Sequence, residues 1–329
     1  MKKFINRVDD LLIESLSGFA AAHRDLVALH LEPNYLTRAH KPQSKVALIS
    51  GGGSGHEPLH TGFIGYGMLD AACPGHVFTS PTPDQMLAAA EAVENGKGVL
   101  FVVKNYAGDI MNFEMAAEML PFENATVITS DDVAVENSTY TTGRRGVAGT
   151  VIVEKCVGSL AETGADLAAC KALGDKVNRC TASMGVALSS CTVPAAGRPT
   201  FDLASHELEM GVGIHGEPGR RREAMRTADE IVADLVHAIL EDLKPATGTE
   251  VLLMVNGFTG TPLMELYVLY NAAAKLLEQR GLVIKRSLVG DYTTSLEMAG
   301  ASITVCLLDE EILRHWDSPV HTAALRWGR

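Results

Sequence analysis

Two histidines of this chain stand in similar glycine-rich segments. The first segment reads GGGSGHEP at residues 51–58 and contains His56, and the second reads GVGIHGEPG at residues 211–219 and contains His215. Small residues around both histidines leave the imidazole rings open to a ligand. Histidine is a common catalytic and ligand-binding residue, because its imidazole gains and loses a proton near neutral pH. One such segment is also typical of a plain turn, but two in one chain indicate a functional site.

Further polar residues follow short apolar runs at 46–50, 98–103 and 125–129, each of which predicts a buried strand. Ligands of open α/β sheets bind where the carboxyl ends of such strands meet. We therefore expect the loops that follow these strands to form one cleft. The residues in these loops that offer chemistry, besides the two histidines, are Lys104, Asn105, Asp109, Asp131 and Asp132.

Not every polar residue in this set is expected to bind a ligand. We interpret Asp131 and Asp132 as the solvated end of a strand. Arg144 and Arg145 could meet an acidic partner, although a structural role is favoured slightly.

The familiar nucleotide and metal motifs are absent from the sequence. There is no G-x-x-x-x-G-K-[ST] loop, and the dinucleotide fingerprint fails because His56 stands where its last glycine belongs. The sequence also lacks a G-x-S-x-G elbow and an H-E-x-x-H pair. We expect the chain to bind neither ATP nor a metal ion by itself.

The elements that must position these residues alternate between strands and helices. Apolar spacing predicts a helix over 8–22, a helix over about 82–94 with Thr82 and Pro83 at its start, and another over 111–120. Such alternation favours parallel βαβ units. Because the composition changes near residue 183, we predict two α/β domains, 1–182 and 183–329, with a substrate cleft between their strand-end loops. The last residues are expected to pack back on the first domain.

Composition and charge restrict the class of protein. The chain has 329 residues, a net charge of −12 and six cysteines without C-x-x-C spacing. An acidic chain is a poor match for nucleic acid or an anionic membrane. The N-terminus lacks the apolar core of a signal peptide, and no apolar run is long enough to span a membrane. We expect a cytoplasmic protein with reduced thiols.

Several strings resemble the dihydroxyacetone kinase K subunit family. They are SGGGSGHEP (50–58), FTSPTPDQ (78–85), VVKNYAGDIMNFEMA (102–116), DDVAVENS (131–138), TGRRGVAGT (142–150), CTVPAAG (191–197), MGVGIHGEPG (210–219) and WDSPVHTAAL (316–325). The resemblance covers nearly the whole chain. It implies a phosphotransferase subunit that binds dihydroxyacetone covalently, as a hemiaminal on a histidine ring nitrogen. A separate nucleotide-binding L subunit, or a fused L domain, supplies the phosphate.

The resemblance also implies roles for individual residues. The hemiaminal histidine matches His215, the base near the reacting hydroxyl matches Asp109, and a histidine that hydrogen-bonds substrate matches His56. The other expected substrate contacts are Gly53, Ser54 and Lys104. Mg-ATP or ADP is expected on the L subunit, in some members with a phosphocarrier subunit acting through L, and this chain is expected to form a homodimer.

Two other functions stay open at this point. The family includes ketose-binding paralogues that act as transcriptional co-activators, and a sensor of that kind could retain Asp109. A kinase subunit for a tetrulose is a further alternative, because a larger ketose offers the same carbonyl. The sequence does not show whether phosphate comes from ATP or from a phosphoenolpyruvate relay.

Overall fold

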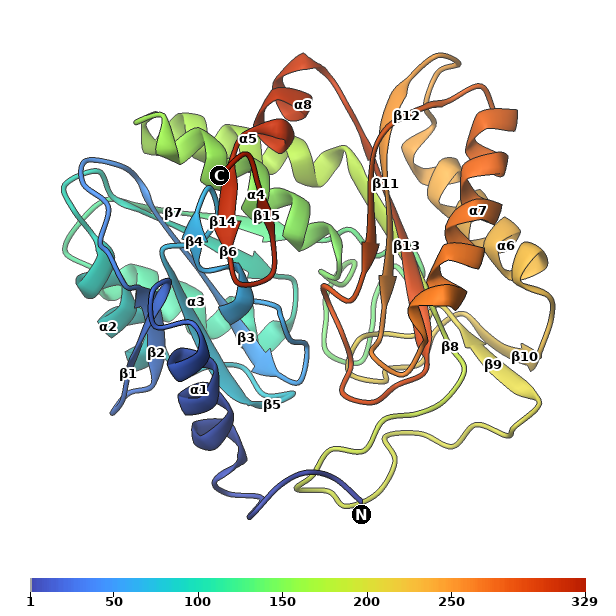
Figure 1. Cartoon of the computed structure of the whole chain (residues 1–329), viewed down its shortest axis with the longest axis horizontal. Helices are drawn as coiled ribbons and strands as arrows, with labels where there is room; N and C mark the ends of the chain where they lie inside the picture. The colour runs from blue at the N-terminus through green and yellow to red at the C-terminus, as the bar shows by residue number, and fades with distance from the viewer. Residues whose placement is uncertain (1) are drawn as a thin grey trace.

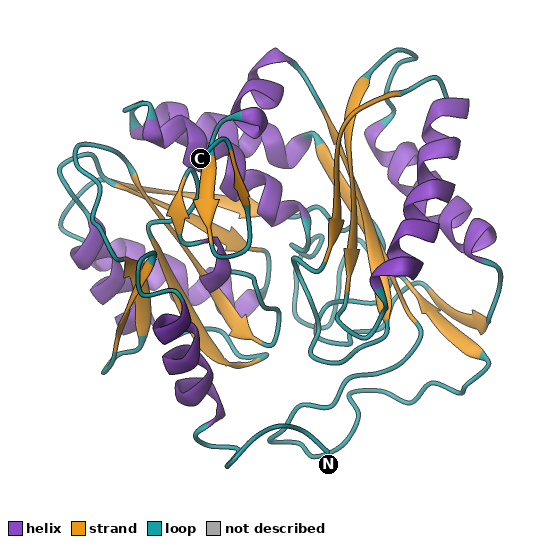
Figure 2. Cartoon of the chain, in the orientation of Figure 1, coloured by secondary structure: helices purple, strands orange, loops and turns teal. Residues whose placement is uncertain are grey.

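The computed structural model describes residues 2–329, and its two six-stranded sheets lie side by side with helices outside and between them (Figures 1 and 2). Helices α2 and α3 cover the outer face of the first sheet, and α6 and α7 cover the outer face of the second. Helices α4 and α5 fill the space between the sheets, where one apolar core contacts both. The eight helices of the described residues are α1 (Leu11–Ala22), α2 (Pro83–Val93), α3 (Ala107–Met119), α4 (Gly149–Glu162), α5 (Leu167–Arg179), α6 (Ala228–Leu243), α7 (Leu263–Gln279) and α8 (Glu310–Asp317).

The first sheet has a parallel centre and an antiparallel edge. Along its central strand, Leu48 faces the core shared with α4 while Ala47 and Ile49 face α2 and α3. This period of two, with both faces covered, is why the strand reads as a continuous apolar run. In spatial order the strands are β1 (Val27–His30), β2 (Tyr35–Arg38), β5 (Ala71–Val77), β3 (Ala47–Ser54), β6 (Val99–Lys104) and β7 (Asn124–Thr129).

The second sheet is mostly antiparallel, so the expectation of parallel βαβ units is wrong for this half of the chain. In this sheet only β11 (Glu250–Gly257) and β12 (Val283–Gly290) pair in parallel. After β12 the chain returns through the loop at 291–299, which contains no helix. Strand β13 (Gly300–Leu307) then lies between β8 (Thr181–Ala187) and β11, antiparallel to both. A connection without a crossover helix favours antiparallel pairing. In spatial order the strands are β10 (Arg221–Ala224), β9 (Glu207–Met210), β8 (Thr181–Ala187), β13 (Gly300–Leu307), β11 (Glu250–Gly257) and β12 (Val283–Gly290).

The C-terminal segment returns to the side of the first sheet (Figure 1). Helix α8 packs on α4 through Ile312 and Trp316, which belong to the core between the sheets. A small third sheet joins β4 (Gly65–Tyr66) to β14 (Val320–Thr322) and β15 (Arg326–Trp327). No helix within residues 2–329 has the length and apolar character needed to cross a membrane.

Among the element boundaries that differ from the predicted ones, two affect the site. Gly51 to Gly53 belong to strand β3 rather than to a loop. The neighbouring strand comes so close that a side chain on Gly51 would lie 2.6 Å from the Cys73 carbonyl oxygen, which explains the glycine at this position. Helix α3 begins at Ala107 rather than near Met111. Asp109 therefore lies in the first turn of a helix, where its position is fixed more firmly than in a loop.

Candidate functional site

The two histidine segments meet between the sheets. The rings of His56 and His215 lie edge to face, with their centroids 4.6 Å apart. The Phe78 ring stacks on His56 with ring centroids 4.9 Å apart, and the Tyr106 and His215 rings lie edge to face with centroids 4.6 Å apart. Aromatic contacts of this kind fix ring orientation, so both imidazoles are held in place before any ligand binds.

The proton of His56 is placed by a contact from the second sheet. His56 Nδ1 lies 2.7 Å from the Thr294 carbonyl oxygen, which can only accept, so Nδ1 carries the proton and donates it. The other ring nitrogen, Nε2, is buried and has no hydrogen-bond partner within the described chain. Burial first, and then the charges of His215 and Lys104, hold the pKa of His56 well below its usual value. His56 is thus a neutral imidazole with an unused acceptor nitrogen.

The orientation of His215 is set by Glu217. The carboxylate accepts the His215 backbone N–H through Oε2 at 2.9 Å and faces Nδ1 through Oε1 at 3.1 Å. Burial opposes ionisation of Glu217, but His215 and Arg145 together hold its pKa at about 2. A side chain on Gly213 would collide with this carboxylate, which explains the second glycine of the segment. With its proton on Nδ1, His215 has its lone pair on Nε2.

Lys104 and Asp109 lie beside the first histidine segment. Lys104 is the last residue of β6, and its Nζ lies 3.8 Å from Asp109 Oδ2. Asp109 Oδ1 is buried without a hydrogen-bond partner in the described residues. A side chain on Gly52 would overlap the Lys104 ammonium, so this glycine makes room for the charge. Asp109 therefore presents a free oxygen close to a fixed cation.

A cavity of about 530 Å³ opens onto these groups. Three of the predicted site residues line it: Gly53, Asp109 and His215, while His56 and Lys104 lie buried next to its wall. The volume is ample for a small polar ligand. The other lining residues are Phe78, Thr79, Ser80, Tyr106, Gly108, Asn112, Tyr140, Val193, Thr200.

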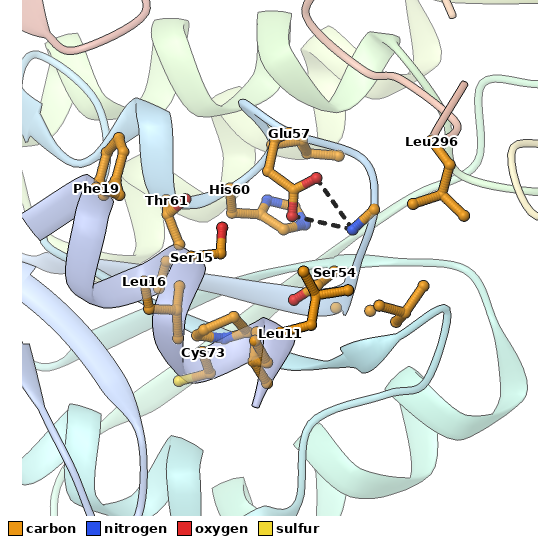
Figure 3. A pocket seen from close by; sticks show the side chains of 18 residues that line it. Leu11, Ser15, Leu16, Phe19, Ser54, Glu57, His60, Thr61, Cys73 and Leu296 are labelled. Carbon is orange, nitrogen blue, oxygen red and sulfur yellow. Dashed lines mark hydrogen bonds between the residues drawn. The ribbon is translucent and has the colours of Figure 1, made fainter. Parts of the chain in front are cut away.

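Ser54 faces away from this cavity. Its hydroxyl donates to the Gly75 carbonyl oxygen at 2.7 Å, and it lines a second cavity of about 190 Å³ beneath α1 (Figure 3). In the same cavity the Glu57 carboxylate accepts the Gly55 backbone N–H, which fixes the end of the first histidine segment. His60 also lines this second cavity.

The interpretation of Asp131 and Asp132 as a solvated strand end is wrong, because both are buried. Asp131 accepts backbone N–H groups at the start of α4 and the Ser183 hydroxyl. Asp132 pairs with Arg145 at 2.7 Å, and Arg145 also donates to the Gly211 carbonyl oxygen at 2.8 Å. Burial raises the pKa of Asp132, with Arg145 opposing, to about 6. Through the bond from Arg145 to Gly211, this pair holds the start of the second histidine segment in place.

Loop contacts between the sheets complete the site. The loop at 291–299 donates two backbone hydrogen bonds to the first histidine segment, from the Thr294 N–H to the His56 carbonyl oxygen and from the Leu296 N–H to the Gly55 carbonyl oxygen. In return, the Thr294 carbonyl oxygen accepts from the His56 ring. Sequence reasoning missed Phe78, Tyr106, Glu217 and Thr294. Glu217 could have been found from its place two residues after His215, whereas nothing in the sequence near Thr294 indicates its contact.

Within residues 2–329, no group of three or more His, Cys, Asp or Glu side chains is arranged to hold a metal ion.

Comparison with known proteins gives consistent matches. The Dak1 domain model matches residues 17–324. The chain is 49% identical to the PEP-dependent dihydroxyacetone kinase, dihydroxyacetone-binding subunit DhaK, of Escherichia coli (strain K12), over 100% of both chains.

Two solved structures are also similar to this chain. The dihydroxyacetone kinase operon co-activator Dha-DhaQ has a TM-score of 0.88 and 34% identity, covering 94% of this chain and 96% of that one. The dihydroxyacetone kinase of C. freundii has a TM-score of 0.86 and 35% identity, covering 98% of this chain and 60% of that one.

Proposed function

The chain belongs to the Dak1 domain family, and we propose that it is the dihydroxyacetone-binding subunit of a dihydroxyacetone kinase. The observation that carries the proposal is the meeting of His215, His56 and Asp109 at one cavity, each with an unused or available polar atom. We also propose that residues 1–182 and 183–329 form two domains with the substrate between them.

His215 captures the ketone. Its Nε2 lone pair forms a bond to the carbonyl carbon, and the carbonyl π pair moves to the oxygen, which takes a proton from solvent. The Nδ1 proton passes to Glu217 and from there to solvent, so no proton is gained or lost overall. The adduct contains every atom of the substrate, because addition to the carbonyl expels no water. Glycerol has no carbonyl and cannot be captured in this way. The Nε2 atom of His56 then accepts a hydrogen bond from a substrate hydroxyl.

Asp109 acts on the terminal hydroxyl. Its free Oδ1 accepts the hydroxyl proton as the oxygen attacks phosphorus. Lys104 keeps this region positive enough for a carboxylate and an incoming phosphate to come together. Gly53 lets the substrate approach the backbone closely. The Ser54 hydroxyl is turned away from the cavity, so we propose that Ser54 contributes only through its backbone.

The phosphate donor is a separate subunit. The chain has no nucleotide motif of a known kind, so we propose that Mg-ATP or ADP is bound by an L subunit that docks over the open cavity. The name of the Escherichia coli relative favours a phosphoenolpyruvate-driven donor, with a phosphocarrier acting through L. The proposal includes a cytoplasmic location and a homodimer.

A co-activator role is the second candidate, because the Dha-DhaQ co-activator shares the fold over nearly the full length of this chain. A retained catalytic base favours the kinase subunit. A tetrulose remains the alternative substrate, since the cavity of about 530 Å³ also has room for a four-carbon ketose.

Transfer of labelled phosphate distinguishes these functions. The chain is mixed with an L subunit and its phosphate donor, and dihydroxyacetone and erythrulose are compared as acceptors. A kinase subunit gives labelled dihydroxyacetone phosphate at a rate that depends on the concentration of this chain. Substrate binding without any transfer would contradict the kinase and favour the sensor. A strong preference for erythrulose would assign the tetrulose.

A further inference from the structure

A row of four buried polar side chains runs from the substrate cavity into the interior of the first domain. Asp109 lines the cavity, and the Lys104 ammonium lies 3.8 Å from its carboxylate. On the other side, Lys104 Nζ lies 2.9 Å from His60 Nε2, and His60 Nδ1 lies 2.6 Å from Glu154 Oε1. His60 and Glu154 have no part in the chemistry proposed so far.

The direction of the hydrogen bonds in this row follows from Lys104. An ammonium group can only donate, so His60 Nε2 accepts from it. The proton of the neutral His60 ring is then on Nδ1 and is donated to Glu154. Ser50 Oγ also lies 2.9 Å from Nδ1, and its own proton is used by the Val102 carbonyl oxygen at 2.7 Å. The protons of Lys104, His60 and Ser50 that lie in this row are therefore each assigned to one acceptor.

The charges in the row make a purely structural role a poor explanation. Glu154 is fully buried, and its Oε2 atom has no hydrogen-bond partner in the described residues. Burial, opposed by Lys104 and Ser50, raises the pKa of this carboxyl to about 8. A buried carboxyl with an unsatisfied oxygen costs folding free energy. An apolar residue would pack here at lower cost. The benefit that offsets the cost of Glu154 therefore lies in its effect, through His60, on Lys104.

The contact that His60 shapes is the one between Lys104 and Asp109. A direct, charge-assisted hydrogen bond between ammonium and carboxylate has a length of about 2.7–2.9 Å, and the observed separation is 3.8 Å. Lys104 donates instead to His60 and, at 3.4 Å, to the Gly51 carbonyl oxygen. The ammonium is therefore held near Asp109 without occupying the oxygen atoms of the base.

We infer that His60 and Glu154 are positioning residues for phosphoryl transfer, which hold the Lys104 ammonium at a distance where it stabilises charge but leaves Asp109 free to accept a proton. The inference rests on the proposed function and adds two residues to it. Without the His60 acceptor, Lys104 turns to Asp109, pairs with it directly and weakens it as a base. The titratable groups that face Lys104 and His60 are Asp109, Glu154 and His56.

The test compares steady-state kinetics of the chain with the L subunit supplied in excess. His60→Leu removes the acceptor, and His60→Gln restores an acceptor oxygen of similar reach. His315→Leu is the matched control, because His315 is also buried against α4, where it contacts Ser159 at 3.0 Å and the Lys155 ammonium donates to its carbonyl oxygen. Lowered thermal stability is expected in both leucine variants, and lowered turnover only in the first.

We expect His60→Leu to lower kcat at least about tenfold, within the range for impaired general base catalysis, with KM for dihydroxyacetone changed less than about twofold. The acidic limb of its kcat–pH profile should move to lower pH, because a base paired with an ammonium ionises more readily. A change in stability alone would not move this limb. His60→Gln should recover most of the activity.

Glu154→Gln keeps the shape of the side chain. It tests the same inference if His60→Leu does not fold. It should move the limb in the same direction by a smaller amount, and combining it with His60→Gln should give less than the sum of the two effects. Folded variants with wild-type kcat and an unmoved limb would overturn the inference while the wild type remains active. A wild type without any transfer would contradict the proposed function, and this inference with it.

Discussion

The rings of His56 and His215 meet at 84°, and in each ring the Nδ1 atom is occupied by a fixed partner. For His56 the partner is the Thr294 carbonyl oxygen, and for His215 it is the Glu217 carboxylate. Both rings therefore have their lone pair on Nε2. One of these nitrogens can bond covalently to a carbonyl carbon while the other accepts a hydrogen bond from the same small ligand.

Asp109→Asn separates capture from transfer. The amide keeps the size of the side chain but cannot take the hydroxyl proton, so turnover with the L subunit should fall about a hundredfold or more. The adduct with dihydroxyacetone should form as in the wild type, because Asp109 is not needed for addition to the ketone. Turnover assays and intact-protein mass spectrometry on the same sample check both halves. An unchanged rate would remove Asp109 from the mechanism.

Glu217→Gln should impair capture through the tautomer of His215. An amide NH₂ group turned to Nδ1 favours the ring form with its proton on Nε2, which leaves no lone pair for the ketone. We expect adduct formation to slow by about tenfold or more. The matched control is Glu57→Gln in the first histidine segment, whose carboxylate contacts the Gly55 backbone N–H. Equal rates in the two variants would show that Glu217 does not set the tautomer.

Gly53→Ala should disrupt the cavity wall. The new Cβ atom would lie 2.6 Å from the Thr79 backbone nitrogen and 2.8 Å from the Phe78 backbone, which cannot yield as a flexible side chain would. We expect a lower melting temperature and loss of dihydroxyacetone binding, measured by thermal unfolding and by adduct mass. Gly18→Ala is the control, because the space around Gly18 in α1 is open. It should stabilise the chain by about 0.5–1 kcal/mol. An unaffected Gly53→Ala variant would contradict the close approach.

Glu154 should make stability depend on pH. The pKa of its carboxyl is about 8 in the folded chain and 4.5 in the absence of such an environment. Between these values the unfolded chain has lost the proton and the folded chain keeps it, so the contribution of Glu154 to stability decreases as pH rises through this window. Glu154→Gln removes the effect. Its unfolding free energy relative to wild type should rise by up to about 1.4 kcal/mol per pH unit.

Denaturant unfolding of both proteins at several pH values between about 5 and 8 measures this difference. A constant difference across the window would mean that Glu154 has an ordinary pKa and is not held protonated by burial.

The sequence allowed the principal strands and the convergence of the two histidine segments to be predicted. Apolar runs define β3, β6 and β7. The predicted start of α2 at Thr82 and Pro83 is confirmed, and Gln85 completes a capping box with Thr82 there. These signals are local, because a buried strand or a helix cap depends on residues within a few positions of each other.

Contacts between distant residues could not be predicted in this way. Thr294 reaches His56 from the loop before β13, and no periodicity indicates that contact. In the sequence, Asp132 has the character of a surface carboxylate, because its partner in the interior, Arg145, cannot be identified from the sequence. The antiparallel entry of β13 depends on the packing of the second sheet and not on its own residues. The sequence also does not show which side of β3 faces the cavity. It therefore could not distinguish Gly53, which lines the cavity, from Ser54, whose hydroxyl is turned away from it.

Covalent capture by His215 is tested most directly by the mass of the intact chain after incubation with dihydroxyacetone under gentle conditions. The wild type should gain the mass of one whole substrate molecule, because a hemiaminal forms without loss of water. Glycerol should give no adduct, and neither should His215→Ala. An adduct that persists in His215→Ala, or a wild type that binds dihydroxyacetone without any gain in covalent mass, would contradict the assignment of His215 as the nucleophile.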